Sequence, residues 1–193
     1  MLGILPTTLE VNGIEYAIRT DFRDILRIVA AFNDPDLTDK DKYYVLMATI
    51  YKDVQSIPKN DTAAAYEAAV SFMECSSQRE DAPSPRVVNW EKDEQLLFPA
   101  INKVAGYEVR SVPYLHWWTF LGFFQGIDRE DTWGFILMLR QKKARGKKLE
   151  KYEKEFWAAN RSMCEIDPPR TMAETTGNAL NDLFNELVKG GAG

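Results

Sequence analysis

The feature that most constrains this chain is an apolar and aromatic run at residues 112–127, VPYLHWWTFLGFFQGI. A helix that is apolar nearly all round lies in a protein core or in a membrane. A membrane span needs about 20 unbroken apolar residues, whereas charged residues follow this run at 128–131. We therefore predict the central core helix of a globular protein, with Pro113 in its first turn. The expected core side chains are His116, Trp117, Trp118, Phe120, Leu121 and Phe124.

The composition is that of an ordinary globular protein, with 193 residues, 45% hydrophobic and 27% charged. The net charge of −5 argues against general coating of nucleic acid. The first residues lack the basic region and the long apolar run of a signal peptide, so we expect an intracellular protein. We predict one helical domain over residues 1–163. An appendage should follow over 164–193, partly helical at about 171–188 and with a flexible end.

An N-terminal β-hairpin is predicted at about residues 8–19. Apolar and polar residues alternate on both sides of Asn12-Gly13, and Asn-Gly between alternating segments is the strongest short hairpin signal. A lone hairpin is marginal in water, so its apolar side should cover helices.

Apolar residues at helical spacing predict further segments at about residues 20–33, 38–54, 62–75, 90–105, 129–145 and 147–160. Thr20, Thr38 and Asp128 are the expected N-caps of three of these helices. Pro99 should kink or split the helix that contains it, and Gly146 should separate the last two. The resulting prediction is a mainly α fold, an antiparallel helical bundle with the N-terminal β-hairpin packed on it.

Residues that could perform catalysis are few. His116 is the single histidine and has no second histidine or cysteine at ligand spacing. It could act as a general base or a metal ligand, and the alternative is a histidine that packs in the core. The acidic residues at 91–94 could be catalytic carboxylates, or they could stabilise the start of a helix by interacting with its dipole. Trp117 and Trp118 can line a groove or fill the core. No phosphate loop or nucleophile motif occurs, so we expect no enzyme, no metal site and no cofactor.

The strongest surface feature is a basic segment at residues 140–154, which holds eight lysines and arginines against two glutamates, a local charge of +6. Its cations are Arg140, Lys142, Lys143, Arg145, Lys147, Lys148, Lys151 and Lys154. Such asymmetry can mark a site for an acidic protein or for nucleic acid. A solvated helix face is the alternative, supported by a Glu150–Lys154 pair at i,i+4 spacing. No aromatic residue for base stacking is interleaved within residues 140–151.

Several local patterns resemble the bacteriophage gene-product-fifteen family of long-tailed phages and prophages. The most specific pattern is LHWWTFL at residues 115–121. The others are the hairpin return and first helix at 14–23, the aromatic and acidic helix start at 90–94, and the closing helices at 136–140 and 148–156. The resemblance covers about residues 8–160, and Pro99 and the tail after Met163 depart from it.

This resemblance implies a role in tail morphogenesis in the cytoplasm of the bacterial host. Proteins of the family are treated as tail assembly chaperones or tail assembly proteins, encoded near the tape measure protein. Such a chaperone would shield the helix-forming tape measure protein until tail tube subunits assemble around it, through many weak helix-in-groove contacts. Further implied partners are the tail tube protein, a second tail chaperone and a second copy of the chain. The side chains expected to contact the partner are Lys143, Arg145, Lys147, Lys148 and Lys151.

Two other classes of function stay open at this point. The chain could be a structural tail component retained in the virion, or a nucleic-acid-binding regulator that uses the basic segment. Proteomics of purified virions separates the first class from a chaperone, and a salt-dependent shift with DNA or RNA identifies the second.

Overall fold

The computed structural model describes residues 3–75 and 87–166. Contacts along the chain group them into two compact units. The first unit contains residues 3–75 and 113–121, and the second contains residues 87–112 and 122–166. The single domain over 1–163 stays a prediction. The helix expected at 171–188 and the flexible end lie outside the described residues.

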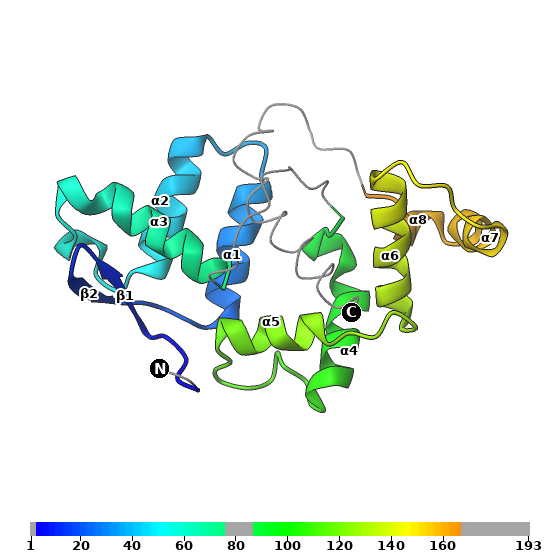
Figure 1. Cartoon of the computed structure of the whole chain (residues 1–193), viewed down its shortest axis with the longest axis horizontal. Coiled ribbons are helices and arrows are strands. Elements are labelled where there is room, and N and C mark those ends of the chain that lie inside the picture. Colours follow the sequence, from blue (N-terminus) through cyan, green and yellow to red (C-terminus); the bar gives the residue numbers. More distant parts are fainter. Residues whose placement is uncertain (1–2, 76–86, 167–193) are drawn as a thin grey trace. The chain divides into compact units, whose positions relative to one another are not determined.

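The described chain is mainly helical and begins with a two-stranded antiparallel hairpin, as the sequence predicts (Figure 1). The elements are β1 (Thr8–Val11), β2 (Ile14–Ala17), α1 (Phe22–Asn33), α2 (Asp39–Ile50), η1 (Val54–Ser56), η2 (Lys59–Asp61), α3 (Thr62–Met73), α4 (Trp90–Ala105), α5 (Trp117–Gln125), α6 (Thr132–Ala144), α7 (Lys151–Ala159) and α8 (Arg161–Cys164). No described helix is long and apolar enough to cross a membrane.

The hairpin forms where Asn12-Gly13 predicted it. Both turn residues have positive φ, 49° and 85°, and Val11 pairs with Ile14 across the turn. Strand β1 packs against α3, and the Asn12 amide donates a hydrogen bond to the Asp61 carboxylate at 2.8 Å. The buried side of the hairpin therefore covers helices of the first unit, which gives the two strands the support that they lack alone.

Helix caps in the first unit follow the sequence at one position and depart from it at another. Thr38 and Asp41 form the capping box of α2. The N-cap of α1 is Asp21, whose carboxylate accepts the Arg23 amide N–H, and not the expected Thr20. The Thr20 hydroxyl instead hydrogen-bonds the Tyr114 hydroxyl at 2.7 Å, a partner that lies 94 residues along the chain.

The central helix is shorter than predicted, because α5 begins at Trp117 and leaves Pro113 outside it. The residues before α5 are held in an extended conformation by the chain that leads into α1. The Phe22 amide donates to the Leu115 carbonyl at 3.0 Å, and the Trp117 amide donates to the Thr20 carbonyl at 2.7 Å. These two hydrogen bonds use backbone groups that a longer helix would have needed for its own first turn.

Helix α4 runs unbroken through Pro99, so of the predicted kink or split, the split does not occur. Proline removes the hydrogen bond to the carbonyl four residues earlier, which is that of Gln95. The side chains of Gln95 and Pro99 are both exposed, so the Gln95 carbonyl lies on the solvent side of the helix and can bind water. The helix ends at Gly106, a left-handed C-cap with φ 79°.

The last helices of the second unit also start later than predicted. Helix α6 is capped by Asp131, which accepts the Trp133 amide N–H, and not by Asp128. Gly146 has φ 67° and ends the helical run, as expected. Residues 147–150 are not helical, and α7 starts only after Glu150, which forms a capping box with Glu153.

Candidate partner-binding surface

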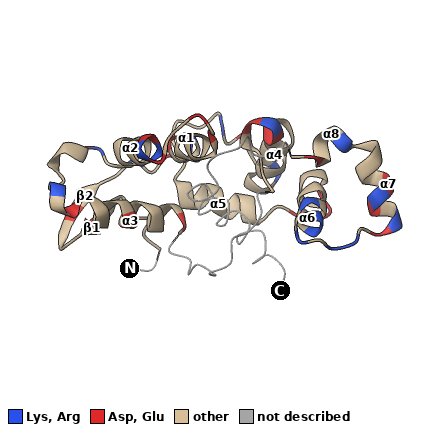
Figure 2. Ribbon diagram, turned by 90° about the horizontal axis from the view of Figure 1, so that it is seen from above, with Lys and Arg blue, Asp and Glu red and all other residues tan. Residues whose placement is uncertain are grey.

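The basic segment spans three pieces of the second unit: the end of α6, the connection at residues 145–150, and the start of α7 (Figure 2). Because residues 147–150 do not continue a helix, the cations are not arranged along one helix face. Each cation therefore has its own environment: some hold the protein together, and others are exposed.

Arg140 is buried and belongs to the core of the second unit. Its guanidinium pairs with both carboxylate oxygens of Asp93 on α4, at 2.7 and 2.8 Å, and both side chains are 2% exposed. It also donates hydrogen bonds to three backbone carbonyls, those of Val87, Met163 and Cys164. This cation therefore holds segments of the chain together and is not available to a partner.

Lys142 is also engaged within the protein. Its ammonium forms an ion pair with the carboxylate of Glu153, a side chain that is fully buried on α7. The hydrogen bond from Lys142 is the main cause that holds the pKa of Glu153 below its usual range, and the hydrogen bond from the Glu150 amide is the second. The same bond to Glu153 raises the pKa of Lys142. The pair joins α6 to α7, so Lys142 is a structural cation.

The other six cations have no ion-pair partner within residues 3–75 and 87–166. All six side chains are exposed: Lys143, Arg145, Lys147, Lys148, Lys151 and Lys154. The Glu150–Lys154 pair that supported a self-neutralised helix face is not formed, since Glu150 caps α7 instead. The exposed positive charge is therefore greater than it would be if Glu150 neutralised Lys154, as their i,i+4 spacing suggested.

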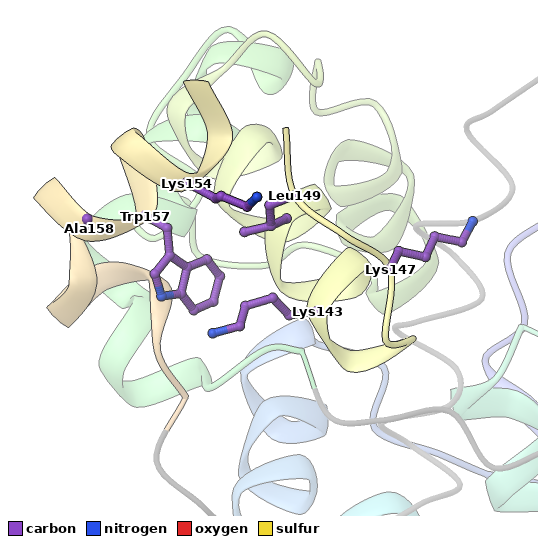
Figure 3. A pocket seen from close by; sticks show the side chains of 6 residues that line it. All are labelled: Lys143, Lys147, Leu149, Lys154, Trp157 and Ala158. Carbon is purple, nitrogen blue, oxygen red and sulfur yellow. The ribbon is translucent and has the colours of Figure 1, made fainter. Parts of the chain in front are cut away.

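A pocket of about 330 Å³ opens among these exposed cations (Figure 3). It is lined by Lys143, Lys147, Leu149, Lys154, Trp157 and Ala158. The Lys143 ammonium lies 4.0 Å from the centroid of the half-buried Trp157 ring, a cation–π contact between α6 and α7. Figure 3 shows Lys143 pointing toward Trp157, while the end of Lys147 points away from it. The pocket therefore combines an indole and two aliphatic side chains with ammonium groups.

The five predicted contact residues are all exposed, but the structure divides them. Lys143 and Lys147 line the pocket, whereas Arg145, Lys148 and Lys151 lie outside it. Lys154 and Trp157 are not among the predicted contact residues. Their proximity to Lys143 depends on the turn of the chain at residues 145–150, which the prediction of a helix from residue 147 left out.

The six predicted core side chains lie along α5 and just before it. Five are buried: His116, Trp117, Phe120, Leu121 and Phe124. Trp118 is half-buried, and its indole N–H donates to the Phe72 carbonyl at 2.9 Å. The Trp117 indole donates to the Met73 carbonyl at the same distance. Both indoles therefore fasten α5 to the end of α3.

His116 has no ring nitrogen left for a metal or a substrate. Its Nδ1 accepts the Trp118 amide N–H at 3.1 Å, so this nitrogen carries no proton. Its Nε2 donates to the Pro6 carbonyl at 3.0 Å. No cluster of three or more metal-ligating side chains occurs in the described ranges.

The acidic cluster at the start of α4 is likewise divided among different environments. Asp93 is buried against Arg140, and it also accepts the Asn89 amide N–H at 2.8 Å. Glu94 forms an ion pair with Arg110 at 3.3 Å, and Glu91 is exposed. The three side chains therefore do not converge on one point, as a pair of catalytic carboxylates would.

Comparison with protein families gave one match that covers most of the chain. The family model described as Bacteriophage Gp15 protein matches residues 2–164. A comparison with curated proteins and one with solved structures found no match.

Proposed function

The chain belongs to the Bacteriophage Gp15 protein family, and from this membership we propose that it is a tail morphogenesis protein that acts as a tail assembly chaperone. It binds the tape measure protein in the cytoplasm of the bacterial host before the tail tube polymerises. The role is one of binding and not of catalysis. The tail tube protein and a second tail chaperone are further candidate partners.

The observation that carries this proposal is a family match accompanied by an exposed cationic surface beside an apolar pocket. A chaperone for a long helical protein needs a surface that holds amphipathic segments weakly and repeatedly. Six cations without ion-pair partners in the described ranges supply the charge, and Trp157 and Leu149 in the pocket supply the apolar area. Exposed charge on this scale also speeds association with an oppositely charged partner.

The experiment is co-expression with fragments of the tape measure protein encoded by the same phage or prophage. Size-exclusion chromatography with light scattering then measures whether a fragment that is insoluble alone elutes in a complex, and at what stoichiometry. We expect at least one such fragment to co-elute with the chain. If none of the fragments forms a complex with the chain, the chaperone role is refuted and a structural tail component is favoured.

Charge reversal and virion proteomics complete the test. Reversing the charges of Lys143, Arg145, Lys147, Lys148 and Lys151 should weaken the complex and reduce its salt dependence, since exposed ion pairs are screened by salt. Unchanged binding would remove these side chains from the contact surface. Mass spectrometry of purified virions should not detect a chaperone, whereas a structural component would be present in every particle.

A further inference from the structure

We propose that the pocket between α6 and α7 is a binding site for an acidic amphipathic helix of a partner protein. One apolar side chain of that helix would enter beside Trp157 and Leu149, and neighbouring carboxylates would meet Lys143 and Lys154. This inference deepens the proposed function and rests on it for the identity of the partner. The chemistry of the site, however, follows from the residues that line it.

The charge of the site is the first argument. Arg140 and Lys142 are neutralised by buried carboxylates, whereas the lysines of the pocket have no ion-pair partner in the part of the chain that the structure describes. A cation beside an apolar surface interacts more strongly with a carboxylate than a fully hydrated one, because less water screens the pair. The complementary ligand is therefore an anion attached to an apolar group.

The apolar part of the pocket is the second argument. Trp157, Leu149 and Ala158 form its apolar lining, and its volume of about 330 Å³ lies at the lower end of the range for ligand pockets, about 300–1,000 Å³. Tryptophan is also the side chain most enriched among residues that dominate interface energies. On an amphipathic helix, residues at i, i+3 and i+4 share one side, so an apolar residue and its acidic neighbours can reach the pocket together.

Nucleic acid fits the site less well than an acidic helix. Binding of single-stranded nucleic acid relies on aromatic faces that are open for base stacking, but the Lys143 ammonium already lies 4.0 Å from the Trp157 ring centroid. The chain as a whole also carries a net charge of −5, which repels a phosphate backbone at long range. A second copy of the chain is the remaining alternative occupant.

The test uses two double variants that remove the same charge at different places. Lys143→Gln with Lys154→Gln removes two charges from the pocket (the pocket variant), and Lys52→Gln with Lys59→Gln removes two exposed charges outside the basic segment (the outer variant). The probe is a fluorescently labelled amphipathic peptide of about 20 residues, roughly 30 Å as a helix, with leucines on one face and glutamates beside them. A peptide with lysines in place of the glutamates and a labelled oligothymidylate are the controls.

We expect the full chain to bind the acidic peptide by fluorescence anisotropy and not to bind the lysine peptide. The pocket variant should weaken binding about tenfold, while the outer variant should change it less than about twofold, since isolated exposed charges contribute little. Trp157→Ala should weaken binding about tenfold or more. Circular dichroism of each variant verifies that α7 has not unfolded, and the charge variants keep the test valid if Trp157→Ala does unfold.

Three results would overturn the inference. The two double variants could weaken peptide binding equally, or the chain could bind oligothymidylate but not the acidic peptide. The chain could also self-associate so that a second copy fills the pocket. Tape measure fragments distinguish the inference from the proposed function. If a fragment binds and both double variants bind it equally, the chaperone role stands and the pocket inference fails. If no fragment binds but the acidic peptide occupies the pocket, the inference stands and the chaperone role fails.

Discussion

Replacing Arg140 by methionine should destabilise the second unit more than any other removal of charge in the basic segment. The guanidinium donates five hydrogen bonds, two to Asp93 and three to backbone carbonyls. Methionine fills much of the same space but leaves the Asp93 carboxylate buried without its counter-ion. Removing one partner of a buried ion pair typically costs about 3–5 kcal/mol. We expect a loss of this size in the free energy of unfolding.

Urea denaturation followed by circular dichroism measures this loss, and the total tryptophan emission includes a contribution from Trp133, whose ring centroid lies 5.3 Å from the Arg140 guanidinium. Arg145→Met is the matched control. Arg145 is exposed and has no ion pair in the described ranges, so its loss should change the free energy of unfolding by less than about 0.5 kcal/mol.

A double variant, Arg140→Met with Asp93→Leu, tests the physical reason. It removes both charges, so the cost of an unpaired buried carboxylate disappears and about 1 kcal/mol or more of the stability should return. Three carbonyls remain without their donor, so the recovery should be incomplete. A loss below about 1 kcal/mol for Arg140→Met, or a double variant no more stable than the single one, would refute this reasoning.

Three further measurements test other parts of the structure. Gly134→Ala should lower the urea midpoint, because an added Cβ would lie 2.1 Å from the Asp128 carbonyl oxygen, a clash worth about 1–3 kcal/mol; Gly122→Ala, with open space around it, should raise the midpoint. Hydrogen bonds from Arg110 lower the pKa of Glu108 to about 2, so this pair stabilises the fold above pH 4.5 and the benefit fades toward pH 2; Glu108→Gln should flatten that part of the Tm profile. Burial raises the pKa of the Cys75 thiol to about 12, so alkylation by iodoacetamide at pH 8 should be at least about a hundredfold slower than in urea, and rapid labelling of the folded chain would contradict this.

Several features of the fold were predictable from the sequence because the groups that form them lie a few residues apart. Asn12-Gly13 makes the hairpin turn, Thr38 and Asp41 cap α2, and Gly106 ends α4. The buried face of α6 also follows helical spacing, with Trp133, Ile136, Leu137 and Arg140 all buried. In each case the physical cause is a local hydrogen bond, a backbone angle or the helical repeat.

The N-caps of α1 and α6 were mispredicted because other local groups, or distant ones, compete for the same cap positions. Asp21 caps α1, and its other carboxylate oxygen also accepts the Leu115 amide N–H at 3.2 Å, 94 residues away. Asp131 caps α6, while Asp128 accepts the Glu130 amide N–H in the preceding turn. A sequence pattern identifies the candidate caps but cannot choose among them when the choice depends on tertiary contacts.

The sequence alone determined that this chain is mainly helical, that it opens with a hairpin, and that it carries a dense basic segment. Only the tertiary structure decided which of those cations remain exposed. Arg140 pairs with the buried Asp93, 47 residues away, and Lys142 pairs with Glu153 across the turn at residues 145–150, where a helix was expected from residue 147. The same turn brings Lys143 onto Trp157 and forms the pocket. Charge is fixed by composition, but its availability depends on which buried groups the fold places beside it.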